Sequence, residues 1–184
     1  MREATGSVQA GGMRLSSPLP VRLETIDPWH AYVAPLAAAA GLRHDPRAEV
    51  VLHVTDLPDD CRPADPWIVD SRPHLTVAAV PDAVRVGPFV VPGLTACLRC
   101  VRAWRDGPTP SDRPVAEPLA PGPGVDAGLL ALALGWAARD VATWVGGGTP
   151  STWSSTVTVG TDLRPDARSW QRHPHCGCSW GEAV

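Results

Sequence analysis

"VRVGPFVVPGLTACLRC" (residues 84–100) joins a run of β-branched residues to a pair of cysteines. The run predicts one or two strands within 83–93, with a turn at Gly87-Pro88. Cys97 and Cys100 follow at once as a CxxC pair. Far downstream, "RHPHCGCSW" (172–180) adds a CxC pair close to the end of the chain. Because chain ends usually fray, cysteines placed there indicate that the tail is tied to the body of the protein.

The spacing of the four cysteines predicts a structural zinc site. Structural zinc takes four ligands in a tetrahedron, and two cysteines one or two residues apart occupy one edge of it. Gly177 lets the backbone of the CxC pair approach the metal closely. Four thiolates leave no open position for water, so the metal is expected to be structural rather than catalytic. The predicted ligands are Cys97, Cys100, Cys176 and Cys178.

Other interpretations of the cysteines remain open at this point. Cys97 and Cys100 also fit a thioredoxin-like redox dithiol, which leaves the CxC pair unexplained. The pairs can also be two unrelated structural pairs or simple buried thiols. A Cys₃His shell would use His173 or His175 in place of one cysteine, although such histidines more often flank a site and donate to sulfur or backbone. Cys61 has no neighbouring cysteine and is expected to be a plain loop or core thiol.

The order of the predicted elements favours an α/β fold. Helical patterns at 27–42 and 125–145 separate the strand-like runs, which is typical of an α/β layer. Pro35 falls inside the first helix and implies a kink. The predicted strands are 20–26, 49–55, 66–70, 74–80, 83–93 and 152–160.

The length of 184 residues suits one domain with one core. We expect residues 1–20 to form a disordered or loose arm and residues 21–184 to form a single domain. Within that domain, six prolines make 106–124 an extended loop. The helix at 125–145 is apolar nearly all round, so it should be buried on several sides. Packing against a second copy in a homodimer and burial within one chain both explain this pattern.

Composition excludes several classes of function. The net charge is −3 and the isoelectric point about 6.0, which gives no electrostatic reason to expect nucleic acid or an acidic membrane as partner. The chain has no lysine, which excludes a P-loop lysine and a Schiff base. The most apolar stretch, 128–138, is too short to span a bilayer, and residues 1–20 lack a signal-peptide core. We therefore expect a soluble cytoplasmic protein with reduced thiols.

The two cysteine-bearing stretches resemble the ThiF-like proteins of ribosomal-peptide tailoring. These are the cyclodehydratase partner proteins of azoline, azole and thiopeptide pathways, which are related to ubiquitin-activating adenylating enzymes. The resemblance covers about 48–104 and 125–180. It implies a partial ThiF-like, Rossmann-type sheet with flanking helices, closed by zinc on the same four cysteines.

The departures from that family are as informative as the match. A complete adenylating fold opens with a Gly-rich nucleotide loop after the first strand, and no GxGxxG is present. The glycines of "ATGSVQAGGM" (4–13) follow no strand. Cys61 lies in the wrong stretch to carry a thioester, and too few residues precede the first matched strand to hold a leader-binding winged helix. The sequence therefore resembles a shortened member, for which we expect no catalytic and no nucleotide-binding residues.

The resemblance implies a non-catalytic zinc scaffold in a peptide-modification complex. Such a protein would assist a YcaO-type, ATP-dependent cyclodehydratase or a related tailoring enzyme on the precursor peptide. The eight tryptophans fit both an interface and a core. The alternatives are an adenylating or sulfur-transfer enzyme of the ThiF type and a thiol oxidoreductase that uses the CxxC pair.

Overall fold

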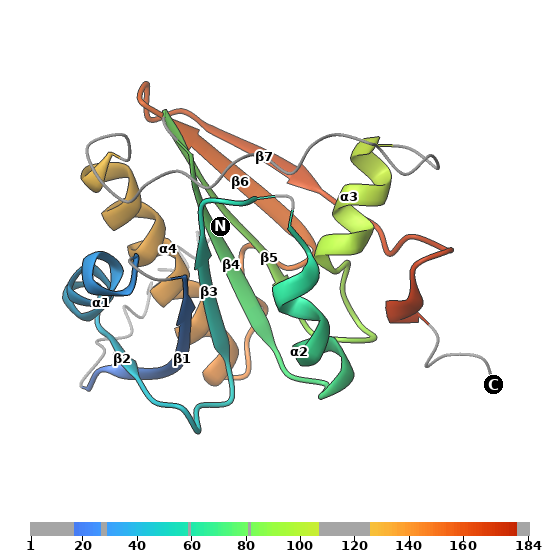
Figure 1. Ribbon diagram of the computed structural model, residues 1–184, viewed down its shortest axis with the longest axis horizontal. Coiled ribbons are helices and arrows are strands. Elements are labelled where there is room, and N and C mark those ends of the chain that lie inside the picture. The colour runs from blue at the N-terminus through green and yellow to red at the C-terminus, as the bar shows by residue number, and fades with distance from the viewer. Residues whose placement is uncertain (1–16, 27–28, 59, 81, 107–125, 180–184) are drawn as a thin grey trace, which may run out of the picture.

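The computed structural model describes residues 17–26, 29–58, 60–80, 82–106 and 126–179. Within these ranges a seven-stranded sheet is flanked by four α-helices and two short 3₁₀ turns (Figure 1). The strands are β1 (Leu19–Thr25), β2 (Leu42–His44), β3 (Val51–Thr55), β4 (His74–Val80), β5 (Ala83–Val90), β6 (Ser155–Gly160) and β7 (Pro165–Ser169). The helices are α1 (Trp29–Ala39), α2 (Asp65–Val69), α3 (Leu98–Asp106) and α4 (Ala127–Val145), and the 3₁₀ turns are η1 (Arg62–Ala64) and η2 (Gly177–Ser179).

The sheet has the order β2-β1-β3-β4-β5-β6-β7. The pairs from β2 to β4 are parallel, and those from β4 to β7 are antiparallel. All five residues of β3 are buried. A strand that is hydrophobic and buried on both faces is typical of a parallel sheet covered by helices on each side.

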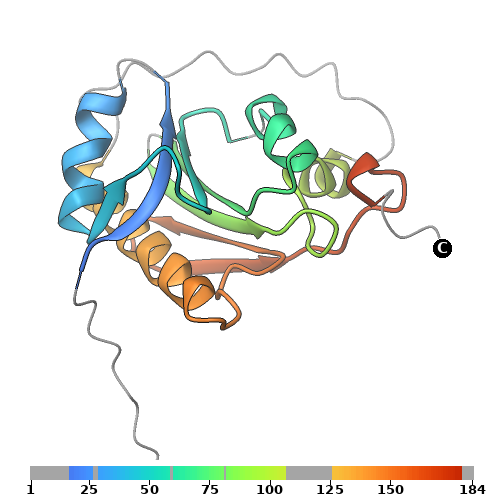
Figure 2. The same ribbon diagram turned by 90° about the horizontal axis from the view of Figure 1, so that it is seen from below.

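The two faces of the sheet carry different layers (Figure 2). Helices α1 and α4 pack on one face, where Leu52, Val54 and Leu75 join the main hydrophobic core. The alternate residues point to the other face, which α2 and α3 cover with smaller clusters around Trp67 and Val90. The first face therefore carries the main core, and the second face carries the cysteines.

Most of the predicted elements are confirmed. The strands expected at 20–26, 49–55, 74–80, 83–93 and 152–160 correspond to β1, β3, β4, β5 and β6, and the helices at 27–42 and 125–145 to α1 and α4. Helix α4 begins where expected because the carboxylate of Asp126 accepts a hydrogen bond from the Leu129 backbone N–H, at 2.9 Å. Within the described part of the chain, no helix is long and apolar enough to cross a membrane.

Some predictions are wrong. Residues 66–69 of the strand predicted at 66–70 belong to helix α2 instead, because Asp65 and Pro66 favour the first turn of a helix and the apolar run is too short to show a period. Strand β1 begins at Leu19, inside the predicted arm 1–20. Residues 1–16 of that arm, and 107–124 of the predicted proline-rich loop, lie outside the described residues.

Helix α4 is less buried than predicted. It buries one broad face but leaves Ala131, Gly135 and Leu132 exposed, the last to 43%. Most residues on this exposed strip are small. They count as apolar in the sequence pattern, but they add little apolar surface. The prediction that this helix is buried on several sides is therefore wrong for the strip.

Two histidines are buried beneath α2. The rings of His53 on β3 and His74 on β4 each lie 5.4 Å from the ring of Trp67. The pKa of both histidines is lowered to about 4, mainly by burial. For His53 the proximity of His74 contributes to the same shift. Both rings are therefore neutral in the folded protein at neutral pH.

The folded protein should lose stability as the pH falls from about 6.5 toward 4. Over this range the unfolded chain takes up protons on His53 and His74 that the folded chain does not, which costs up to about 3 kcal/mol for each histidine. Urea unfolding at a series of pH values measures the slope. The variant His53→Gln should show a shallower slope than the wild type. An unchanged slope in that variant would contradict the assignment.

Candidate metal centre

A tight turn after β5 delivers the CxxC pair to the start of α3. The Val91 N–H donates to the Thr95 hydroxyl at 2.8 Å, and the Leu94 N–H donates to the Val91 carbonyl at 3.0 Å. Cys97 immediately precedes α3, and Cys100 lies in its first turn. The free N–H groups and the dipole at a helix N-terminus stabilise thiolates. The local fold therefore places Cys100 where a thiolate is stabilised, with Cys97 directly before it.

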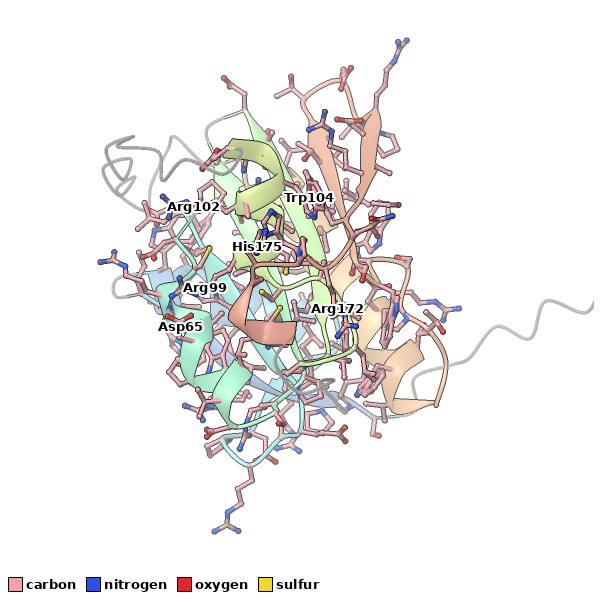
Figure 3. All side chains as sticks on the ribbon, turned by 90° about the vertical axis from the view of Figure 1, so that its right-hand side faces the viewer. Asp65, Arg99, Arg102, Trp104, Arg172 and His175 are labelled. Atoms are coloured by element: carbon pink, nitrogen blue, oxygen red, sulfur yellow. The ribbon has the colours of Figure 1, made fainter. Side chains whose placement is uncertain are left out.

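The C-terminal segment runs back from β7 to the same helix (Figure 3). The Trp170 indole N–H donates to the Thr156 hydroxyl at 2.9 Å, and its backbone N–H donates to the Ser154 carbonyl at 2.7 Å. The Trp104 indole N–H on α3 donates to the Gln171 carbonyl, also at 2.9 Å. These bonds hold the tail beside α3 before it reaches the CxC pair.

The four predicted ligands come together in one group. The Sγ of Cys97 lies 3.6 Å from those of Cys100 and Cys176, and the Sγ atoms of Cys100 and Cys178 are 3.3 Å apart. All four ligand atoms lie within 4.8 Å of one another. Zinc bound to four sulfurs at about 2.3 Å gives a tetrahedron with edges of about 3.8 Å. The group could therefore hold a metal ion with little movement.

The sulfur atoms share their protons unequally. The S–H groups of Cys178 and Cys97 donate to Cys100 and lower the pKa of Cys100 to about 2. Donation to Cys100 raises the pKa of Cys178 to about 12. Donation to Cys100 raises the pKa of Cys97 as well. A divalent metal would displace the remaining protons, so metal binding at this site is expected to release protons and to weaken as the pH falls.

The neighbouring histidines lie beside the sulfur group. The ring of His173 lies 5.0 Å from the ring of Trp104 and 5.8 Å from that of His175. Among the described residues, the group with metal-ligand spacing contains the four cysteines and neither histidine. The backbone N–H of His173 donates to the sulfur of Cys100, which is a supporting contact of the kind expected for a flanking residue.

Cys61 lies apart from this group, in the core. It is buried in the cluster that contains Val51, Trp67 and Leu98. Burial raises the pKa of the Cys61 thiol to about 11. A thiol in such surroundings is inert, which confirms the prediction of a plain core cysteine.

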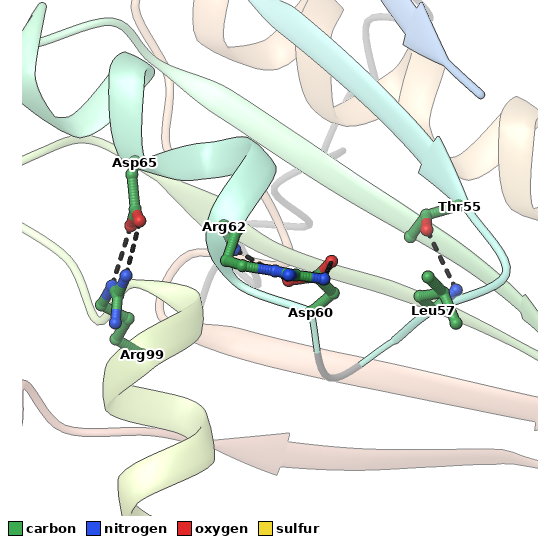
Figure 4. A network of polar contacts seen from close by, with 6 residues as sticks. All are labelled: Thr55, Leu57, Asp60, Arg62, Asp65 and Arg99. Carbon is green, nitrogen blue, oxygen red and sulfur yellow. Dashed lines mark hydrogen bonds and ion pairs between the residues drawn. The ribbon is translucent and has the colours of Figure 1, made fainter. Parts of the chain in front are cut away.

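Sequence reasoning missed an ion pair that joins the two helices on this face. The guanidinium of Arg99, inside the CxxC pair, donates from Nε and Nη2 to the two carboxylate oxygens of Asp65 on α2, at 2.8 and 2.5 Å (Figure 4). Two further local contacts, Arg62 to Asp60 and the Leu57 N–H to Thr55, hold the loop that leads into α2. No signal in the sequence pairs Asp65 with Arg99, because they lie 34 residues apart.

The sheet also has the place where nucleotides bind in related α/β folds. Strand β1 lies between β2 and β3, so the direction of the chain connections reverses there, and ligands of open α/β sheets bind outside the carboxyl ends of such strands. The connection from β1 to α1 reads Ile26-Asp27-Pro28, without glycine, and Asp56 follows β3. Phosphate binding needs free N–H groups at a helix N-terminus, and proline has none. The sequence at this position therefore differs from a Gly-rich phosphate-binding loop.

Comparison with known proteins supports the fold. No sequence family matches the chain, and no curated protein does either. Among solved structures, the heterocyclase TruD is 22% identical with a TM-score of 0.61, over 87% of this chain and 27% of its own. A heterocyclase in complex with substrate and cofactor is 17% identical with a TM-score of 0.60, over 88% of this chain and 25% of its own. MccB from E. coli is 18% identical with a TM-score of 0.57, over 73% of this chain and 40% of its own.

The chain thus spans well under half the length of each of these proteins. At these identities the similarity is one of fold. It agrees with the α/β class predicted from the order of strands and helices.

Replacing one ligand should separate a metal tie from a simple thiol cluster. We expect Cys178→Ser to lower the bound metal and to speed proteolysis after residue 160, because the tail then loses its covalent link through the metal. Elemental analysis and limited proteolysis measure the two effects. Cys61→Ser is the matched control and should keep its metal. A Cys178→Ser protein that stays fully metallated and equally resistant would show that the ligand assignment is wrong.

Proposed function

We propose that this chain is a non-catalytic, zinc-containing partner protein in a ribosomal-peptide modification complex. In this role it assists a YcaO-type, ATP-dependent cyclodehydratase, or a related tailoring enzyme, on the precursor peptide. The observation that carries the proposal is the four-cysteine group on the α2 and α3 face of a sheet whose fold is shared with heterocyclases.

The chemistry of the cysteine group supports zinc as the metal. Four thiolates in a tetrahedral arrangement suit zinc or an iron–sulfur centre, and a group that spans 4.8 Å suits a single ion. Three of the four cysteines are buried, so four sulfurs and the protein around them would close the shell. A closed shell has no place for a substrate or a water, which supports a structural role.

The residues that connect β1 to α1 support a role without nucleotide chemistry. MccB, which shares this fold over 40% of its chain, has been solved with ATP. In the present chain the residues between β1 and α1 include Asp27 and Pro28 and no glycine, and lysine is absent throughout. An aspartate near a phosphate adds repulsion instead of attraction. The features that remain are a stable sheet, a metal-tied tail and exposed aromatic and arginine side chains, which are suited to binding other proteins.

The thiols give the proposal a cellular setting. Thiols stay reduced and free to bind metal in the cytoplasm, where we expect the complex to work.

The exposed strip of α4 is where a homodimer would pair. Native mass spectrometry reports the metal content and the number of copies together.

Calorimetry with ATP and Mg²⁺ distinguishes the scaffold from an adenylating enzyme. We expect no measurable heat of binding, because the sequence between β1 and α1 has no glycine and the chain has no lysine to bind the phosphates. Binding in the micromolar range would overturn the scaffold proposal and favour an adenylating or sulfur-transfer enzyme.

Co-expression tests the partnership itself. A tagged form of this chain should retain the YcaO-type enzyme on purification, and ring formation on the precursor peptide should need both proteins. Mass spectrometry detects each ring as the loss of one water. Full ring formation by the enzyme without this chain would contradict the proposed role.

A further inference from the structure

The four cysteines of the metal centre differ in their exposure to solvent. Cys97, Cys100 and Cys176 are buried, with at most 7% of each residue exposed. Cys178 is half-buried, and Gly177 directly before it is exposed. A small reagent from solvent therefore reaches Cys178 more readily than the other three ligands.

A thiol of the other pair lies next to Cys178. The Sγ of Cys100 is 3.3 Å from the Sγ of Cys178, which is shorter than the 3.6 Å between the sulfurs of Cys97 and Cys100. The two residues lie 78 positions apart in the chain. Cysteines that respond to oxidants are accessible and lie beside a second thiol that reacts with the first product. Cys178 and Cys100 have this arrangement.

We propose that the four-cysteine group is also an oxidation site, at which a peroxide joins Cys178 to Cys100 in a disulfide and the metal is released. The oxidant is hydrogen peroxide or an organic hydroperoxide. The inference goes beyond the proposed function, and it rests on the candidate metal centre.

The reaction has two steps. The Cys178 thiolate attacks one oxygen of hydrogen peroxide, the O–O bond breaks, and the leaving hydroxide takes up a proton to become water, so that Cys178 becomes a sulfenic acid. The Cys100 thiolate then attacks the Cys178 sulfur, the S–O bond breaks, and a second hydroxide leaves and becomes water in the same way. The two thiolates lose two electrons in all, and one peroxide becomes two waters.

The choice of partner decides what happens to the tail. Cys97 and Cys176 are the two thiolates of the group that remain, and a structural zinc ion needs four ligands, so the metal leaves. The new disulfide joins the CxC pair to α3, so the tail stays tied. A disulfide between Cys97 and Cys100 would release the metal and would leave the tail without a link.

Peroxide treatment of the zinc-loaded, wild-type protein tests this inference. We expect release of the metal, detected with a chromophoric zinc indicator, and a protein two hydrogens lighter by mass spectrometry. Trypsin cuts after Arg99 and so separates Cys97 from Cys100, while Cys176 and Cys178 stay in peptide 173–184. A non-reducing digest should therefore contain the Cys100 peptide linked to peptide 173–184, with fragment ions that place the link at Cys178.

Two further readouts follow the first step and the tail. Dimedone, which traps sulfenic acids, should label Cys178 before any other cysteine of the group. The oxidised wild type should resist proteolysis after residue 160, unlike Cys178→Ser. Cys61→Ser is the matched control and should release zinc as fast as the wild type, because Cys61 is buried and lies outside the group.

The outcomes separate the metal centre from its oxidation. Wild-type protein that holds no zinc before treatment would overturn both the metal centre and this inference. Zinc that stays bound in peroxide, a disulfide between Cys97 and Cys100, or first labelling of Cys97 or Cys176 would overturn the oxidation site alone.

Discussion

The contact between the two cysteine pairs is the constraint on which this side of the molecule depends. It joins Cys97, at the start of α3, to Cys176, which lies 79 residues later in the chain. Contacts of such long range are entropically costly to close, and only a strong interaction offsets the cost. Structural zinc contributes roughly 10–16 kcal/mol in small domains, which is comparable to the stability of a whole domain.

The layers on the sheet show why this face uses such a contact. Helices α1 and α4 cover the opposite face with one large core that includes Trp29, Leu130 and Phe89. On the cysteine face, α2 has five residues and α3 has nine, and the hydrophobic clusters beneath them are small. Short helices with few apolar side chains bury little area. The sulfur group, the Asp65–Arg99 pair and the tryptophan hydrogen bonds supply the links that a larger core would otherwise make.

The same arrangement connects the fold to the proposed function. Solved heterocyclases and MccB share the fold of this sheet at 17–22% sequence identity. This chain combines the sheet with a group of four cysteines that could hold a metal ion. The proposed scaffold role assigns to this group the task of fixing the tail beside α3. The buried, neutral histidines His53 and His74 add a requirement for near-neutral pH.

The amino-acid sequence by itself determined the main strands, the long helix at 125–145 and the spacing of the two cysteine pairs. These features are local, because periodicity, turn residues and ligand spacing act over a few residues. The sequence also predicted that the tail is tied, since unpaired cysteines at a chain end have no other evident use.

Only the tertiary structure decided which segments meet. Helix α2 lies where a strand was expected; Asp65 and Pro66 favour a helix locally, but the contacts of Trp67 with the buried histidines and of Asp65 with Arg99 come only from the tertiary structure. Strand β7 is exposed along its whole length and exists through its pairing with β6, so its own residues gave no pattern. The partners of Trp104, Arg172 and Asp65 lie far away in sequence, and such contacts depend on the complete fold.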